Sequence, residues 1–552
     1  MIVLPALLFI LWGEEARCLE ENGGFTFDGD LRHFAVATNT VYIATAETLY
    51  QLSHDLTLVQ SLTQRGILKG GCQMDAQFSR VSETDERNAT FSVNMLLPFV
   101  ETETLISCGV IECGYCEVLD LKNISNVQYM ENIQVGSPRR SSASIGFLVN
   151  VEETTTETYI LTAIQQYEVK STKSSCSTES EAVQLRNTNH KQYGTIFSEI
   201  SEFSIDVIKR CPQGNAEFVD GFQISLTIYL FSNLPSSDTS NRVRLILAAR
   251  AKQTKRRLSG RWGSDPHVDG GTTDTELLLF DISPPLTGDT DEDPDFCSVC
   301  STDRIRLPPK TLKPKAVLFR QKSMTSVLAV RHKAWMVFFI GTGDGQLIKL
   351  AVDKNYHTTC PRVLYRATDD HQVFPKMHLD QVDLKHVYLP FRNQMKRVPV
   401  SKCSTSTNVQ DCWSAQDPYC VWCGTKKSCT FEDDCQDSDW LSIPDDSQQK
   451  MVSYKVVKDD TGQITLNIQT HLSVGQKALS NFACKFSASS SKLCRDGLPQ
   501  QFPQCTCILS NSTLPAGGLH VTVKIRVGTT QLSKALKLSN CSDIEGPPTS
   551  VL

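Results

Sequence analysis

Six cysteines lie within a stretch of thirty-three residues, and their spacing is compatible with two kinds of chemistry. They are Cys403, Cys412, Cys420, Cys423, Cys429 and Cys435. Cys420 and Cys423 have the Cys-x-x-Cys spacing that a tetrahedral zinc ion accepts. In an oxidising compartment the same thiols form disulfides, which can hold a segment too short to build a hydrophobic core. The cellular compartment therefore decides between zinc and crosslinks.

The N-terminus indicates secretion. Residues 4–12 form an unbroken apolar run, which at nine residues is too short to cross a bilayer as a helix. Ala16 and Cys18 supply small side chains at the positions before Leu19, so we predict a signal peptide over residues 1–18. Cleavage leaves twenty of the 21 cysteines, an even number that can all pair. Crosslinks are therefore favoured over zinc.

Two other Cys-x-x-Cys pairs have the same two interpretations. These are Cys113 with Cys116 and Cys297 with Cys300, and for both we expect structural disulfides rather than redox or metal sites, not necessarily within each pair. Cys108 and Cys116 are predicted to be disulfide-bonded.

The remaining composition is consistent with an extracellular protein. Four Asn-x-Ser/Thr triplets, at Asn88, Asn123, Asn511 and Asn540, are candidate glycosylation sites. No later segment has the ~20 apolar residues of a membrane span. The 55 basic and 61 acidic side chains are nearly balanced, so the overall charge gives no support to a nucleic-acid partner.

The chain before Cys403 repeats one pattern, in which an aliphatic strand, a small or glycine-rich turn and a second strand follow one another. Outside one broken region, successive repeats begin about 50 to 65 residues apart, the spacing expected of a β-propeller with four-stranded blades. Seven starts can be counted, two of which share that broken region. The strands are expected at residues 41–45 with 49–52, 105–109 with 116–121, 159–163 with 167–169, 224–231, 243–249 with 277–282, 337–352 and 386–400.

Three segments resemble ligand sites at first sight. Two of them, the basic run at residues 252–261 and the acidic run at residues 289–295, lie in a loop-rich region. The acidic run resembles a calcium-binding EF-hand loop, but it has Pro294 where that loop needs glycine and Cys300 where it needs glutamate. We interpret both as solvated loops. Residues 341–345 are glycine-rich but lack the lysine and helix of a phosphate-binding loop, so we predict a hairpin turn in which glycines supply positive φ.

No catalytic motif is present, so we predict no enzymatic activity, no catalytic residues, no metal and no cofactor. After Cys435 the chain has strand patterns at residues 452–458, 464–470, 520–527 and 532–538. These predict a β-sandwich of about ninety residues.

Two of these motifs resemble a known family. Residues 339–349, Phe-Ile-Gly-Thr-Gly-Asp-Gly-Gln-Leu-Ile-Lys, resemble a late-blade hairpin of sema domains, and residues 417–423, Asp-Pro-Tyr-Cys-Val-Trp-Cys, resemble the core of the PSI cysteine module. The order of propeller, cysteine module and sandwich resembles the N-terminal ectodomain of a plexin. Thr506 between two cysteines and Asn540-Cys541-Ser542 look most like a C-type plexin.

The resemblance implies an all-β chain: a seven-bladed sema propeller over residues 19–402, a PSI module over 403–450, an immunoglobulin-like IPT sandwich over 451–541 and a tail over 542–552. In the family the module has four disulfides. Here Val409 replaces the second cysteine and the eighth has no counterpart near Lys450. The resemblance then implies bonds between Cys403 and Cys420, Cys412 and Cys429, and Cys423 and Cys435.

The implied function is binding the sema domain of a semaphorin through the propeller, as the outer part of a receptor in cell guidance or adhesion. Contact residues do not carry over individually, although residues 159–231 are the expected region. A secreted decoy and a semaphorin-like ligand that binds a plexin are alternatives, with a propeller enzyme more remote. Homodimer formation stays open, as does a secreted or a membrane-anchored form.

Overall fold

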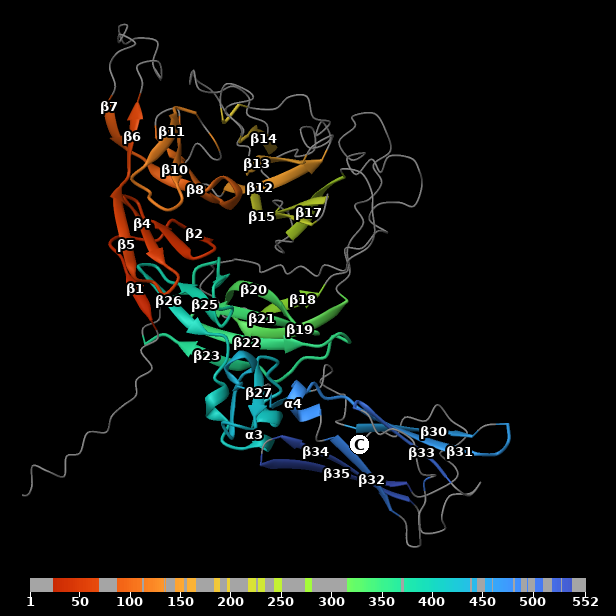
Figure 1. Ribbon diagram of the computed structural model, residues 1–552. Coiled ribbons are helices and arrows are strands. Elements are labelled where there is room, and N and C mark those ends of the chain that lie inside the picture. The colour runs from red at the N-terminus through yellow and green to blue at the C-terminus, as the bar shows by residue number, and fades with distance from the viewer. Residues whose placement is uncertain are drawn as a thin grey trace, which may run out of the picture.

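A computed structural model shows three modules built almost entirely of strands (Figure 1). The propeller comes first, the cysteine module packs beneath it, and the sandwich follows (Figure 1). The structure describes residues 23–68, 87–111, 114–133, 135, 144–152, 156–164, 183–188, 196–198, 217–224, 227–233, 243–250, 274–279, 315–368, 372–436, 439–443, 452–458, 460–479, 482–487, 494, 502–509, 519–527 and 529–538.

Antiparallel sheets make up the propeller, as the sequence predicted. Three four-stranded sheets are each made from consecutive strands. They are β2 (His33–Ala37), β3 (Thr40–Ala44), β4 (Thr48–Ser53) and β5 (Leu58–Thr63); β8 (Ser92–Phe99), β9 (Thr104–Val110), β10 (Tyr115–Asp120) and β11 (Val127–Glu131); and β20 (Met324–His332), β21 (Trp335–Thr342), β22 (Gln346–Val352) and β23 (Arg362–Arg366).

Smaller sheets lie between these, next to segments outside the described residues. They are β12 (Ser144–Glu152), β13 (Thr156–Ile164) and β14 (Val183–Asn187); β15 (Glu217–Ile224), β16 (Thr227–Asn233) and β17 (Val243–Arg250); β18 (Asp274–Leu279) with β19 (Ala316–Lys322); and β6 (Arg65–Leu68) with β7 (Arg87–Thr90). A short 3-10 helix, η1 (Val100–Thr102), connects β8 to β9. The number of blades stays a prediction.

The last sheet of the propeller is completed by the N-terminal strand (Figure 1). β24 (His378–Leu379), β25 (His386–Pro390) and β26 (Gln394–Pro399) are consecutive, and β1 (Gly24–Thr26) pairs with β26 as the outer strand. Because the chain continues from β1 into the first sheet, this pairing joins the first and last sheets of the ring. It also covers a sheet edge that would otherwise be exposed.

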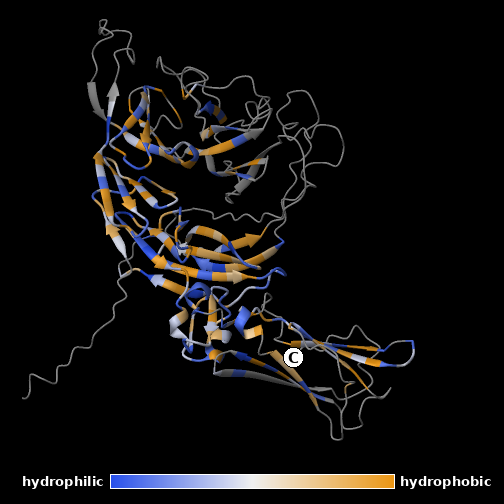
Figure 2. Cartoon of the chain, in the orientation of Figure 1, coloured by the Kyte–Doolittle hydropathy of each residue, from blue (hydrophilic) through white to orange (hydrophobic). Residues whose placement is uncertain are grey.

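Hydrophobic packing between the sheets explains which strands form. Residues 41–44 of β3 and 337–342 of β21 are buried at every position, which is expected of strands covered on both faces. Figure 2 shows hydrophobic residues concentrated along the strands. The hairpins predicted at residues 41–52, 105–121 and 337–352 are confirmed by the pairing of β3 with β4, β9 with β10, and β21 with β22.

Two strand predictions were wrong. The predicted strand at residues 224–231 crosses a hairpin, because Ile224 at the end of β15 pairs with Thr227 at the start of β16. The predicted partners at residues 243–249 and 277–282 lie in different sheets, since β17 pairs with β16 and β18 pairs with β19. A continuous apolar run in the sequence does not reveal where the chain turns back to form a hairpin, nor which other strand each segment pairs with. The predicted strand at residues 167–169 lies outside the described residues.

The cysteine module, over residues 403–450, is small and crosslinked. Its elements are η4 (Cys403–Thr405), α3 (Val409–Ser414), β27 (Cys420–Cys423), β28 (Ser428–Phe431), η5 (Glu432–Asp434) and β29 (Trp440–Ser442), with β27 in the centre of the sheet. Asn408 caps α3, because its side chain accepts a hydrogen bond from the amide of Asp411.

The sandwich has two sheets. One contains β30 (Val452–Lys458), β31 (Ile464–Thr470) and β33 (Gln504–Ile508), and the other contains β32 (Phe482–Ser487), β34 (Leu519–Val527) and β35 (Thr530–Leu538). A single helical turn, α4 (Gln476–Leu479), precedes β32. In β31 buried and half-buried positions alternate, as expected of a strand with one face on a core. The predicted sandwich is therefore confirmed.

Candidate functional site

The junction between the propeller and the cysteine module is built around a buried ion pair. Lys349 of β22 donates a hydrogen bond to Oδ2 of Asp417, and each side chain is only 4% exposed. Ser401 Oγ donates to the same oxygen at 2.7 Å, and the amide of Tyr419 donates to Oδ1 at 3.1 Å. Lys349 Nζ also donates to the carbonyl of Val400 at 2.8 Å. These bonds satisfy the Asp417 carboxylate while holding the module against β22.

Burial lowers the pKa of Lys349, and the adjacent Asp417 carboxylate opposes that shift. A buried charge that lost its partner would be strongly unfavourable, so the two side chains depend on each other. The ring of Tyr419 adds packing, because it stacks on His332 with the ring centroids 4.1 Å apart and lies 5.4 Å from Lys349 Nζ. The junction therefore has a fixed geometry.

Two further lysines bind the rim of the cysteine module. Lys333 pairs with Glu432 and lies 5.1 Å from the ring centre of Trp440. Lys385 pairs with Asp434 at 2.9 Å and lies 5.3 Å from the ring centre of Phe431. Each such contact is weak where it is partly exposed, so they orient the module more than they stabilise it.

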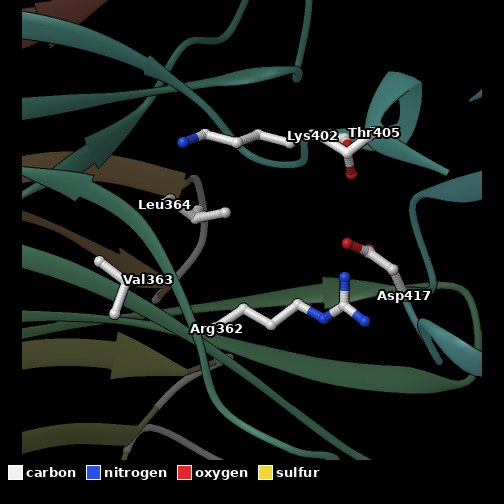
Figure 3. Close-up of a pocket in the computed structure, with 6 residues that line it drawn as sticks. All are labelled: Arg362, Val363, Leu364, Lys402, Thr405 and Asp417. Atoms are coloured by element: carbon white, nitrogen blue, oxygen red, sulfur yellow. The ribbon is translucent and has the colours of Figure 1, made fainter.

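A pocket of about 300 Å³ opens between β23 and the cysteine module. Its lining comprises Arg362, Val363, Leu364, Lys402, Thr405 and Asp417. In Figure 3 the Arg362 guanidinium points toward the Asp417 carboxylate, and the Lys402 side chain extends along the opposite side. Arg362 and Lys402 are exposed, and neither side chain has an ion pair or hydrogen bond within the described part of the chain. A pocket of this volume can hold one small chemical group of a ligand.

A second charged cluster lies at the last sheet of the propeller. Asp380, Asp383 and His386 hold ligand-type atoms within 4.8 Å of one another, which could suit a metal ion. Arg397 already lies between the carboxylates, with its Nε 2.9 Å from Asp380 Oδ2 and its guanidinium also paired with Asp383. Burial raises the pKa of Asp383, but hydrogen bonds from His386 and the amide of Lys385, with Arg397 nearby, lower it to about 2. The cluster thus already contains its cation.

The cysteine module contains three disulfides, Cys403–Cys420, Cys412–Cys429 and Cys423–Cys435, the pairs that the resemblance implies. Thiols bonded in this way are not available to zinc. Val409, in the place of the family's second cysteine, packs against the hydrophobic cluster around Trp422.

Among the other described cysteines, Cys108 is bonded to Cys116, so Cys116 does not pair with Cys113. Two disulfides in the sandwich, Cys484–Cys505 and Cys494–Cys507, crosslink residues for which no pairing was predicted. Cys360 is exposed and unbonded. The other described cysteines are disulfide-bonded, and several cysteines lie outside the described residues, so the expectation that all twenty can pair stays a prediction.

Of the four candidate glycosylation sites, the structure describes Asn88 and Asn123. Asn123 is exposed in a turn, where its Oδ1 accepts a hydrogen bond of 3.1 Å from the amide of Ser125. Asn88 lies in β7. Asn511 and Asn540 lie outside the described residues, as do the signal peptide and the basic and acidic runs. Glycosylation stays a prediction.

In the glycine-rich turn, Gly345 has a φ of 77°, as predicted, but Gly341 and Gly343 serve a different purpose. A Cβ at Gly341 would lie 2.3 Å from Ser326 Oγ, and one at Gly343 would lie 2.4 Å from Ser323 Oγ. These two glycines permit a close approach rather than a left-handed backbone.

The Lys349–Asp417 pair was not predicted, although Lys349 and Asp417 each lie in one of the two family-like motifs of the sequence. A usable signal was present, since a lysine within the apolar strand Gln346–Val352 requires a buried partner. The pocket had no signal in the sequence, because its lining comes from segments more than thirty residues apart. Residues 159–231, the expected ligand region, contribute parts of β13 to β16.

This chain is similar to known proteins in sequence and in fold. The family model described as "PSI: Plexin repeat" matches residues 402–451. Human Plexin-C1 is 24% identical over 564 aligned residues, which cover 93% of this chain and 35% of that protein. Human Plexin-A2 is 30% identical over 113 residues, covering 20% of this chain. This chain thus spans about a third of the length of Plexin-C1.

A solved structure of the full extracellular region of Plexin A4 has a TM-score of 0.51 with this chain at 16% sequence identity. The alignment covers 94% of this chain and 62% of that one, so the two share a fold. No helix among the described residues is long and apolar enough to span a membrane. The plexin repeat, the shared fold and the match to Plexin-C1 along 93% of the chain together identify it as similar to the ectodomain of a plexin.

Proposed function

We propose that this chain is the semaphorin-binding extracellular region of a plexin-like cell-surface receptor and that the propeller contacts the sema domain of the semaphorin. The observation that carries the proposal is the match to Plexin-C1 over 93% of the chain, a share that extends over parts of the propeller, the cysteine module and the sandwich of this chain. The chain acts by binding and has no catalytic role.

The propeller is the part of the chain suited to a large protein partner. Recognition between two folded proteins needs a patch of ~800 Å² per partner with a few buried anchors. The ion pair and rim contacts beneath the propeller occupy the face toward the cysteine module. We therefore place the semaphorin contact on the strands away from that junction, with residues 159–231 as the first region to examine.

A binding screen tests the proposal. The purified glycosylated chain is passed over immobilised semaphorin and plexin ectodomains. Saturable binding to at least one semaphorin is the expected result. Binding to plexins alone would replace the proposal with its alternative, a semaphorin-like ligand. Binding to neither group would contradict both.

The position of the contact can be mapped with an added glycan. Gln223→Asn creates an Asn-Ile-Ser triplet in β15, within the expected region, whereas Lys485→Asn creates an Asn-Phe-Ser triplet on the exposed side of β32 in the sandwich. Once a mobility shift shows that both variants carry the glycan, the first should lose semaphorin binding and the second should keep it. Equal binding by both would move the contact elsewhere.

Whether the chain acts as a receptor part or as a secreted decoy is a separate question. A transcript read beyond Leu552 distinguishes the two: a further cysteine module followed by a membrane span indicates a receptor, and a stop codon indicates the decoy.

A further inference from the structure

The pocket between β23 and the cysteine module has unbalanced charge. Its carboxylate, Asp417, already accepts hydrogen bonds from Lys349, Ser401 and the amide of Tyr419. Arg362 and Lys402 border the same pocket without an ion pair or a side-chain hydrogen bond in the described chain. Because Lys349 neutralises Asp417, the pocket presents two positive charges, on Arg362 and Lys402, that have no ion-pair partner among the described residues. Both side chains are drawn in Figure 3.

The rest of the lining limits the kind of anion that fits. Val363 is 46% exposed and Leu364 forms the buried part of the wall, so one side of the pocket is aliphatic. A volume of about 300 Å³ is at the lower end for ligand sites and suits one short side chain. A long sulfated glycan instead needs a stripe of basic residues, whereas only two cations line this pocket and the whole chain has a net charge of −6.

We propose that this pocket binds a single carboxylate on a short aliphatic stem, the chemistry of a glutamate side chain. Arg362 and Lys402 bind the carboxylate, the guanidinium with two parallel N–H donors, while Val363 and Leu364 contact the stem. Arg362 belongs to β23 of the propeller, Thr405 belongs to η4 at the start of the cysteine module, and Lys402 immediately precedes η4. An occupant therefore bridges the two modules.

Calorimetric titration of the intact glycosylated chain tests the site. The probes are N-acetylglutamate α-amide, a short peptide with one internal glutamate, and a heparin tetrasaccharide. The variants are Arg362→Gln, Lys402→Gln and their combination. Arg366→Gln is the matched control, because Arg366 is an exposed arginine of the same strand that bonds to Gln346 and does not line the pocket.

The amide and the peptide should bind the unmodified chain saturably and less tightly at higher salt. Each single substitution should weaken binding by about tenfold, as expected for loss of one charge-assisted hydrogen bond, and the combination should abolish it. The control should bind like the unmodified chain. Tighter binding of the peptide than of the amide identifies a protein side chain as the source, and equal affinity identifies a small acid.

Three results would overturn the proposal: no saturable binding of either glutamate probe, equal loss in the Arg366→Gln control, or tighter binding of heparin that is lost in the same variants. Thermal unfolding of each variant shows whether a loss of binding reflects misfolding. A semaphorin screen run on the same variants is independent, because it concerns the other face of the propeller.

Discussion

At the scale of single residues, the most consequential feature is a charge placed where water cannot reach it. Lys349 lies in a strand whose neighbours are buried aliphatic residues, and it meets Asp417 from a module that follows it by 68 positions. Taking both charges out of water costs free energy that their mutual attraction only partly offsets, so the pair contributes more to a unique arrangement of the modules than to net stability.

Replacement of one partner of this pair should be far more harmful than replacement of both. Lys349→Met leaves Asp417 buried without its cation and should destabilise the junction by about 3 to 5 kcal/mol. Combining it with Asp417→Leu should recover most of that loss. Lys333→Met, at the half-exposed rim, should cost about 1 kcal/mol or less. Urea unfolding followed by tryptophan fluorescence measures all three, and a double variant as unstable as the single one would argue against a charge effect.

A second buried charge predicts how stability depends on pH. Burial raises the pKa of Glu117 from 4.5 to about 7, against a hydrogen bond from Tyr115 that lowers it. Its cross-strand neighbour Ser107 has a buried hydroxyl without a partner among the described residues, so little stabilises the carboxylate form. Between these two pKa values the folded chain holds a proton that the unfolded chain has lost.

Stability should therefore fall as the pH rises from about 4.5 to about 7 and then level off. Glu117→Gln mimics the protonated form and should remove this part of the pH dependence. Urea midpoints across the range measure the effect. If both proteins show the same slope, another group is responsible.

At the scale of elements, the glycine-rich turn between β21 and β22 shows how close packing requires residues without a side chain. Gly341 leaves room for Ser326 and Val373, which would lie 2.3 and 2.5 Å from an added Cβ. Val373 belongs to the segment that leads into the last sheet, and its amide donates to the carbonyl of Thr342 at 3.1 Å. The hairpin thus positions the next sheet as well as its own strands.

Gly341→Ala should therefore destabilise the propeller by about 1 to 3 kcal/mol, the usual cost of overpacking a filled interior. Gly23→Ala is the matched control, because the nearest atom to its added Cβ is 3.9 Å away, and it should change stability by about 0.5 kcal/mol or less. Differential scanning calorimetry compares the two, and similar unfolding temperatures would mean that the packing around Ser326 relaxes freely.

At the scale of the whole molecule, two hydrophobic junctions connect the three modules. Tyr419 and Ile443 pack with the last sheets of the propeller, and Leu441 packs with Leu472 and Ile525 of the sandwich. Backbone hydrogen bonds reinforce the second junction. The amide of Ser442 donates to Ser473 and the amide of Gly475 donates to Trp440, both at 2.9 Å. The cysteine module therefore packs against both the propeller and the sandwich.

Truncation of the second junction should release the sandwich. Leu472→Ala removes a side chain that is 5% exposed and should cost about 2 to 5 kcal/mol locally. The amides of Ser442 and Gly475 should then exchange hydrogen faster, as measured by mass spectrometry. Leu105→Ala, an equivalent truncation inside the propeller, should leave those amides protected while it remains folded. Unchanged exchange in Leu472→Ala would show that the hydrogen bonds alone hold the junction.

The sequence by itself determined the class and order of the modules. Strand alternation is a local property, so β30 and β31 appeared at residues 452–458 and 464–470 with the predicted bounds. The Asp417-to-Cys423 motif similarly identified the cysteine module, and the plexin-repeat family model, which matches residues 402–451, confirms it.

Tertiary structure alone decided everything that depends on which distant segments meet. It decided in which sheets β17 and β18 lie and that β1 pairs with β26. It also decided the ion pair between Lys349 and Asp417 and the pocket lined by Arg362 and Lys402, whose side chains have no ion pair among the described residues. All of these are contacts between residues far apart in the chain. Local patterns specify how each strand buries one or both faces, but several partners would bury them equally well. The packing of the whole chain selects one arrangement of the strands, and that arrangement determines which charged side chains meet.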